Sequence, residues 1–113
     1  MSMNLKKKII NQSALSELKL LLIKKYPDYI DKLILFGSQA KGTSRGYSDY
    51  DILVILKKSY DWRFENEIYD TCSDINIKYD IITDIKIISS EELQTIRGKQ
   101  PFILNAINNG IVI

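Results

Sequence analysis

Hydrophobic and polar residues follow a helical period near the start of the chain. Leucines recur at helical spacing at positions Leu15, Leu18, Leu21 and Leu22. This period predicts an amphipathic helix, for which Ser13 is a suitable N-cap. Pro27 marks where the helix must end, because proline lacks the backbone N–H that a helix interior requires.

Two apolar segments in the middle of the chain predict strands. Residues 32–36 (KLILF) form a short apolar run that ends at Gly37 and indicate a buried strand. Residues 50–56 (YDILVIL) are apolar on both alternating faces, which is typical of a strand covered on both sides. The intervening residues 37–48 are rich in Gly, Ser, Thr and Lys and predict a loop with room for one helical turn.

The apolar residues then return to a helical period. Phe64, Ile68 and Cys72 are four residues apart within residues 62–72, which predicts an amphipathic helix. Residues 75–88 are dense in Ile and Tyr and predict one or two further strands.

The last part of the chain predicts two more helices. Ser89 or Ser90 precedes two glutamates and opens a short helix with acids in its first turn. Residues 101–113 predict a last helix that stops near Gly110. Because helices alternate with strands, the pattern predicts an α/β fold in which helices cover a small β-sheet, as one domain over residues 1–113.

Composition and charge indicate the class of protein and the partners to expect. Of the 113 residues, 45% are hydrophobic and 27% are charged, which is ordinary for a soluble globular protein. The formal net charge of +2 is too small to favour a nucleic-acid partner. No apolar run approaches the roughly 18 residues of a membrane span, and no signal-peptide core is present. We therefore expect a cytoplasmic protein that does not act at a membrane.

The absence of histidine has the largest chemical consequence. The chain contains no His and a single cysteine, Cys72, which we expect to fill apolar space on its helix. This excludes a His general base, a Ser–His or Cys–His nucleophile pair and a His-liganded zinc. Any catalysis must then rest on carboxylates, lysines, hydroxyls and a hard metal ion.

Two aspartates at the start of the second predicted strand are the candidate chemistry. Asp49 and Asp51 are two residues apart, so on an extended segment they point to the same face. Two like charges at this separation are unfavourable near a buried strand unless a cation neutralises them. Mg²⁺ suits such a pair, because it takes hard oxygen ligands and accepts phosphate oxygens as the remainder.

A glycine–serine turn precedes this pair. Gly37 would let the backbone approach a phosphate, and the Ser38 hydroxyl would donate a hydrogen bond to it. Gly42 would let the loop turn back toward the aspartates. An acid pair alone is common, but the combined pattern G-S-x-A-x-G-x5-S-D-x-D between two buried strands indicates a nucleoside triphosphate site.

The segment from Gly37 to Asp51 resembles the signature of the DNA polymerase β-like nucleotidyltransferase superfamily, in particular its minimal nucleotidyltransferase branch. Gly37, Ser38, Asp49 and Asp51 match the motif positions. The resemblance implies a small mixed β-sheet covered by helices, and transfer of a nucleoside monophosphate from a donor such as ATP with pyrophosphate as the leaving group. It also implies two Mg²⁺ ions that bridge the acid pair and the triphosphate.

The resemblance further implies a third carboxylate on a later strand, which shares one metal ion and helps to deprotonate the acceptor hydroxyl. The candidates are Asp74, Asp80 and Asp84, and the alternative is that no third acid is present. We favour Asp80 because it begins an apolar run after the predicted helix. Lys41 and Arg45, in the loop, are candidate contacts to the triphosphate oxygens.

Three functions are compatible with these residues. We favour transfer of AMP onto a hydroxyl of a partner protein, because we expect no second domain that would select another acceptor. Minimal nucleotidyltransferases of this kind resemble the antitoxin of a two-gene module whose partner is a helical HEPN-type ribonuclease toxin. The alternatives are a non-catalytic nucleotide-binding module that masks its partner by contact, and a homodimer that modifies a small molecule. No residue set indicates the base preference or the acceptor.

Overall fold

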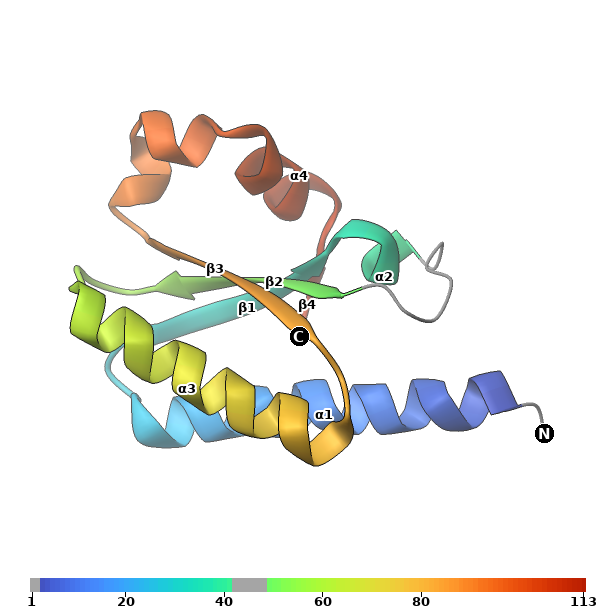
Figure 1. Ribbon diagram of the computed structural model, residues 1–113. Coiled ribbons are helices and arrows are strands. Elements are labelled where there is room, and N and C mark those ends of the chain that lie inside the picture. Colours follow the sequence, from blue (N-terminus) through green and yellow to red (C-terminus); the bar gives the residue numbers. More distant parts are fainter. Residues whose placement is uncertain (1–2, 42–48) are drawn as a thin grey trace.

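A computed structural model describes residues 3–41 and 49–113 of the chain (Figure 1). The elements follow one another in the order α1 (Met3–Lys25), β1 (Ile30–Phe36), α2 (Gly37–Lys41), β2 (Tyr50–Leu56), α3 (Trp62–Tyr79), β3 (Thr83–Ser89), the 3₁₀ helices η1 (Glu92–Gln94) and η2 (Ile96–Lys99), α4 (Pro101–Asn109) and β4 (Ile111–Val112).

The strands form a mixed sheet in the order β3-β2-β1-β4. β1 pairs antiparallel with β2 and with β4, whereas β2 and β3 run parallel. Parallel neighbours need a crossover connection, and α3 supplies it. In Figure 1, α1 and α3 lie on one face of the sheet, and η1, η2 and α4 lie on the other. The predicted α/β class, a small mixed sheet covered by helices, is confirmed.

Alternation along the strands divides the hydrophobic core between the two faces. Leu33 and Leu35 of β1 belong to the cluster with α1 and α3, whereas Ile34 and Phe36 belong to the cluster with α4. β2 alternates in the same way, with Val54 on the first face. Both strands are therefore covered on both sides, as the apolar runs predict.

Helix α3 is longer than the period of its first half predicts. The Asp61 carboxylate accepts a hydrogen bond from the Phe64 N–H at 3.0 Å and caps the helix. Ile75 is buried on the same face as Cys72, so the helix continues through Tyr79 where a strand was expected. Of the one or two strands expected over residues 75–88, one is present as β3, and the expectation was wrong for residues 75–79. Isoleucine density alone does not separate a strand from a buried helix face. Cys72 is buried, as predicted, and burial raises the pKa of its thiol to about 12.

Helix α1 also extends beyond its predicted start. It begins at Met3, so Ser13 lies inside the helix, and its prediction as an N-cap was wrong. No glycine or proline interrupts the residues before Ser13, so nothing stops the helix there. The predicted end is confirmed, because α1 ends at Lys25, two residues before Pro27.

The carboxyl-terminal segment covers the face of the sheet opposite α1 and α3. The Ser89 hydroxyl accepts from the Glu92 N–H, and the Glu92 carboxylate accepts from the Ser89 N–H, each at 3.1 Å. This reciprocal pair has the pattern of a capping box and spans the turn that leads into η1, where a short helix is predicted. α4 ends just before Gly110, as predicted, and β4 then joins the sheet beside β1. Within the described part of the chain, none of the helices is long and apolar enough to cross a membrane.

Candidate active site

Three aspartates gather at one end of the sheet. Asp51 is the second residue of β2 and lies between Phe36 of β1 and Asp84 of β3 in the strand register. Alternation places Asp51 and Asp84 on the face that α4 covers, because their neighbours Ile52 and Ile85 belong to the opposite cluster. Asp49 is exposed and directly precedes β2.

The electrostatics of Asp51 reflect this crowding. Burial raises the pKa of Asp51, and the neighbouring carboxylates Asp84 and Asp49 raise it further. Lys86 acts in the opposite direction and lowers the pKa of Asp51. The ionised form of Asp51 is therefore disfavoured in the protein alone, which is the condition that a bound cation relieves.

Gly37 brings the turn after β1 directly against this carboxylate. Gly37 has a φ of +75°, in the left-handed region that favours glycine. A methyl group at this position would overlap the Asp51 Oδ2 atom and would lie 3.3 Å from Asp51 Cγ. The glycine turn and Asp51 are thus in contact, with no side chain between them. Glycine is needed at position 37 for both reasons.

The remaining predicted contacts to nucleotide are only partly described. Ser38 and Lys41 belong to the short helix α2 that starts at Gly37, and the positions of their side chains are not described. Arg45, like Gly42, lies outside the described residues. The predicted roles of Ser38, Lys41 and Arg45 therefore stay predictions.

The structure places the three candidates for the third carboxylate in different surroundings, on α3, at its end and on β3. Asp74 lies exposed on α3. Asp80 is the exposed C-cap residue of α3, with a left-handed φ of 52° and ψ of 51°. Asp84 lies on β3, directly beside Asp51. The strand register sets Asp84 beside Asp51, whereas Asp80 lies at the end of α3. The choice of a third carboxylate among the three candidates stays a prediction.

The physical reason that Asp84 and not Asp80 lies beside Asp51 is where β3 begins. β3 starts at Thr83, because the turn at Asp80 must first end α3 and reverse the chain. A strand with one covered and one partly open face alternates polar and apolar residues, as Asp84, Ile85, Lys86 and Ile87 do. That alternation was the available signal for Asp84, and it also marks Lys86, which sequence reasoning missed.

A structural role for Asp80 has a testable consequence. Glycine adopts the left-handed conformation without the steric strain of a side chain. We expect Asp80→Gly to leave the free energy of unfolding unchanged or raised by up to about 1 kcal/mol, and Asp80→Val to lower it by roughly 1 kcal/mol. Denaturant unfolding of both variants measures this, and destabilisation by Asp80→Gly would contradict the assignment.

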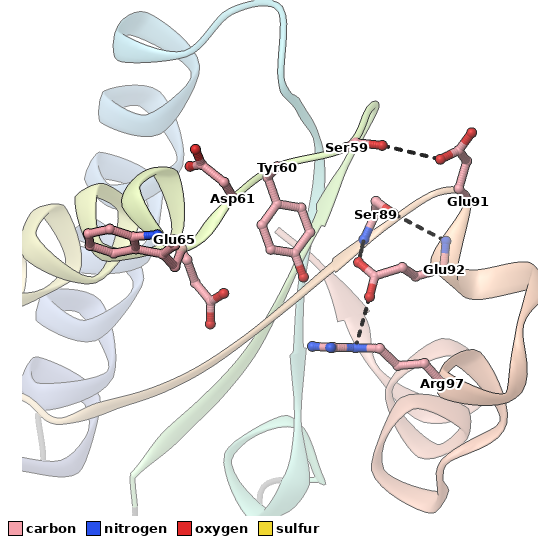
Figure 2. Close-up of a pocket in the computed structure, with 9 residues that line it drawn as sticks. Ser59, Tyr60, Asp61, Glu65, Ser89, Glu91, Glu92 and Arg97 are labelled. Atoms are coloured by element: carbon pink, nitrogen blue, oxygen red, sulfur yellow. Dashed lines mark hydrogen bonds and ion pairs between the residues drawn. The ribbon is translucent and has the colours of Figure 1, made fainter.

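A pocket at the opposite end of β2 and β3 does not belong to this site. Its volume is about 340 Å³, and it is lined by Ser59, Tyr60, Asp61, Trp62, Glu65, Ser89, Glu91, Glu92 and Arg97 (Figure 2). Arg97 forms an ion pair with Glu92 at 3.3 Å and donates to the Ile87 carbonyl at 3.0 Å. Together with the two caps described above, these contacts hold the ends of α3 and η1. The polar lining is explained by these structural contacts.

Asp49, Asp51 and Asp84, which we call the acid face, form an incomplete metal site by themselves. Among the side chains that the structure describes, no three cysteine, aspartate or glutamate groups are arranged to hold a metal ion without further ligands. Carboxylate oxygens on neighbouring strands are nevertheless the donors that a hard cation prefers, and Mg²⁺ takes its remaining ligands from water and phosphate. The donor set therefore fits Mg²⁺ together with a phosphorylated ligand.

A mixed α/β sheet that carries neighbouring aspartates against a glycine turn is the arrangement of a nucleotidyltransferase. The family described as "Polymerase beta, Nucleotidyltransferase" matches residues 16–113. This chain belongs to that family and is a nucleotidyltransferase, which confirms the resemblance seen in the segment from Gly37 to Asp51.

Individual relatives agree with this membership. Two proteins of Methanocaldococcus jannaschii are similar, and both carry the name "Putative protein adenylyltransferase". One, MJ0604, is 32% identical over 102 residues, which cover 90% of this chain and 96% of that protein. The other, MJ0141, is 36% identical over 55 residues, which cover 49% of this chain and 56% of that protein.

A solved structure shares the fold. The crystal structure of the toxin–antitoxin pair MntA–HpeT, in a variant with two aspartate-to-glutamate replacements, contains a chain that matches with a TM-score of 0.57 and 18% identity. The match covers 86% of this chain and 69% of that chain. At this identity the likeness supports the fold.

Proposed function

We propose that this nucleotidyltransferase moves AMP from ATP to a hydroxyl of a partner protein. The acceptor oxygen attacks the α-phosphorus of ATP, the bond to the β-phosphate oxygen breaks, and pyrophosphate leaves. The acceptor proton passes to a nearby carboxylate. One observation carries the proposal, namely the contact of the Gly37 turn with Asp51, where Asp84 lies alongside on the next strand.

We further propose that Asp49, Asp51 and Asp84 hold two Mg²⁺ ions. When bound, these ions neutralise charge on the transferring phosphate. Asp84 replaces Asp80 as the proposed third carboxylate and as the group that receives the acceptor proton, because it faces the same side of the sheet as Asp51. Gly37 lets the triphosphate approach the backbone, and Ser38, Lys41 and Arg45 stay our candidates for the phosphate contacts.

The proposed acceptor is a helical HEPN-type toxin that the modification silences. Support comes from the names of the two relatives as protein adenylyltransferases and from the shared fold with a toxin–antitoxin pair. The proposed transfer needs the acceptor hydroxyl to approach Asp84, and the Asp84 side chain is 46% exposed. An acceptor on another protein can therefore reach it.

Labelled ATP provides the direct test. The protein is incubated with Mg²⁺, ATP labelled at the α-phosphate and the product of the neighbouring gene. We expect Mg²⁺-dependent label on that product, and none when the label is on the γ-phosphate, since the γ-phosphate leaves with pyrophosphate. Absence of label with folded proteins would contradict transfer. If the partner were still neutralised, the non-catalytic binding module would be the better account.

The role of Asp84 is tested by its amide variant. Asp84→Asn keeps the size of the side chain but removes a metal ligand and a proton acceptor. We expect the single-turnover rate of AMP transfer to fall by about a hundredfold to a thousandfold, with ATP still bound. Asp74→Asn is the matched control, because it makes the same replacement at an exposed position on α3. Equal rates for the two variants would exclude Asp84 as the third carboxylate.

A further inference from the structure

Lys86 lies on the acid face without a role in the reaction described above. It follows Asp84 by two residues on β3, so the two side chains share one face of the strand. The Lys86 ammonium nitrogen is 3.5 Å from Asp84 Oδ1 and 5.9 Å from the centre of the Phe102 ring on α4. The Lys86 ammonium therefore lies near both Asp84 and the Phe102 ring of α4.

Carboxyl groups outnumber the positive charges around Lys86 in the metal-free protein. Asp49, Asp51 and Asp84 place three carboxyl groups at one end of the sheet, and Lys86 lowers the pKa of Asp51 against their combined effect. Two other described cations have partners elsewhere, since Lys78 pairs with Glu17 at 2.6 Å and Arg97 pairs with Glu92. Lys86 thus stands where a bound cation would relieve the repulsion between the carboxylates.

We propose that Lys86 is a built-in counter-ion, which occupies Asp84 in the metal-free protein and must leave that carboxylate when a divalent cation binds. The inference rests on the proposed function only in taking Asp84 as a metal ligand. The ammonium and the metal ion compete for the same carboxylate oxygens, so each lowers the occupancy of the other.

The side chain is suited to this exchange. Lys86 is 44% exposed, and its flexible stem allows the ammonium to move without any shift of β3. The nearby Phe102 ring offers a weak cation–π contact that keeps the ammonium at the site after it leaves Asp84. Lys86 is therefore a positioning residue for the acids, which it keeps close together before a metal ion binds.

Divalent-ion binding without nucleotide tests the competition. Mn²⁺ is titrated into the full chain and followed by electron paramagnetic resonance. We expect Lys86→Met to tighten Mn²⁺ binding by roughly two- to fivefold, because the competing ammonium is gone. We expect Lys86→Arg to bind Mn²⁺ as weakly as the unmodified protein or more weakly, because a guanidinium can hold Asp84 with two hydrogen bonds.

Lys78→Met is the matched control, since it removes one positive charge from a lysine whose partner Glu17 is outside the acid face. We expect its Mn²⁺ affinity to stay within experimental error of the unmodified protein. Equal Mn²⁺ affinity of Lys86→Met and Lys78→Met, or no Mn²⁺ binding by any variant, would overturn the proposal.

Thermal unfolding in a chelator gives a second measurement. Lys86→Met is expected to lower the melting temperature, because the carboxylates then repel one another without a counter-ion. Adding Asp84→Asn to that variant is expected to restore most of the loss, which a purely structural role of Lys86 would not produce. Because neither measurement uses ATP or an acceptor, failure of AMP transfer would overturn the proposed function and leave this inference standing.

Discussion

Replacement of Asp51 by asparagine is expected to abolish transfer while making the metal-free protein more stable. Asp51 lies at the centre of the acid face, with Asp84 beside it and Gly37 against it. Removal of its charge eliminates a ligand that we expect to hold the metal, so the transfer rate should fall by about a thousandfold or more. Single-turnover transfer from labelled ATP measures this loss.

The gain in stability has a separate cause. Burial and the two neighbouring carboxylates disfavour ionised Asp51 in the folded protein, and asparagine removes that penalty. We expect the free energy of unfolding at neutral pH to rise by about 1 kcal/mol, which corresponds to roughly 4–8 °C in a domain near this size. Asp31→Asn, at an exposed position of β1, is the matched control and should show neither effect.

The pH dependence of this gain follows from the raised pKa of Asp51. The folded protein keeps the Asp51 proton to higher pH than the unfolded chain, whose carboxyl titrates near the ordinary value of 3.8. The unmodified protein therefore loses stability as pH rises from that value through the raised pKa. The difference between Asp51→Asn and the unmodified protein should grow over this window and become constant above it. A difference that shrinks with rising pH would show that the cause is wrong.

Replacement of Gly37 by alanine is the second change with a large expected effect. The new methyl group would overlap Asp51 Oδ2, and the positive φ of residue 37 strains any L side chain. The left-handed backbone alone costs roughly 1–2 kcal/mol, and the overlap adds to this by displacing the carboxylate. We expect lower stability together with at least a hundredfold slower transfer, because misplaced ligands lose their alignment.

A double-mutant cycle separates the two causes. In an Asp51→Ala background the atoms that overlap are absent, while the strain of the backbone remains. We therefore expect Gly37→Ala to lower the free energy of unfolding less in that background than in the unmodified protein. If the two losses were equal, the turn would not be in contact with Asp51, and the geometry on which the site depends would be incorrect.

Much of the fold and part of the site could be predicted from local pattern. The buried strands β1 and β2, the start of α3 and the cap that opens η1 follow from periods and cap residues within a few positions. The proximity of Asp49 to Asp51 was also predictable locally, because the two residues are two apart at the start of β2. The length of α3 could not be read in this way, since Ile75 is as compatible with a buried helix face as with a strand.

Which of the three candidate acids lies beside Asp51 depended on distant parts of the chain. Asp74, Asp80 and Asp84 are similar in local sequence, and what separates them is where α3 ends and how β3 aligns with β2. The approach of Gly37 to Asp51 and the position of Lys86 beside Asp84 depend in the same way on the packing of whole strands.

The amino-acid sequence by itself determined which chemical groups this protein can use. It supplies carboxylates and a glycine turn, and it contains no histidine. Only the tertiary structure decided which carboxylates meet, because strand register is set by long-range pairing and by the burial of both sheet faces. Local periodicity carries no information about that register.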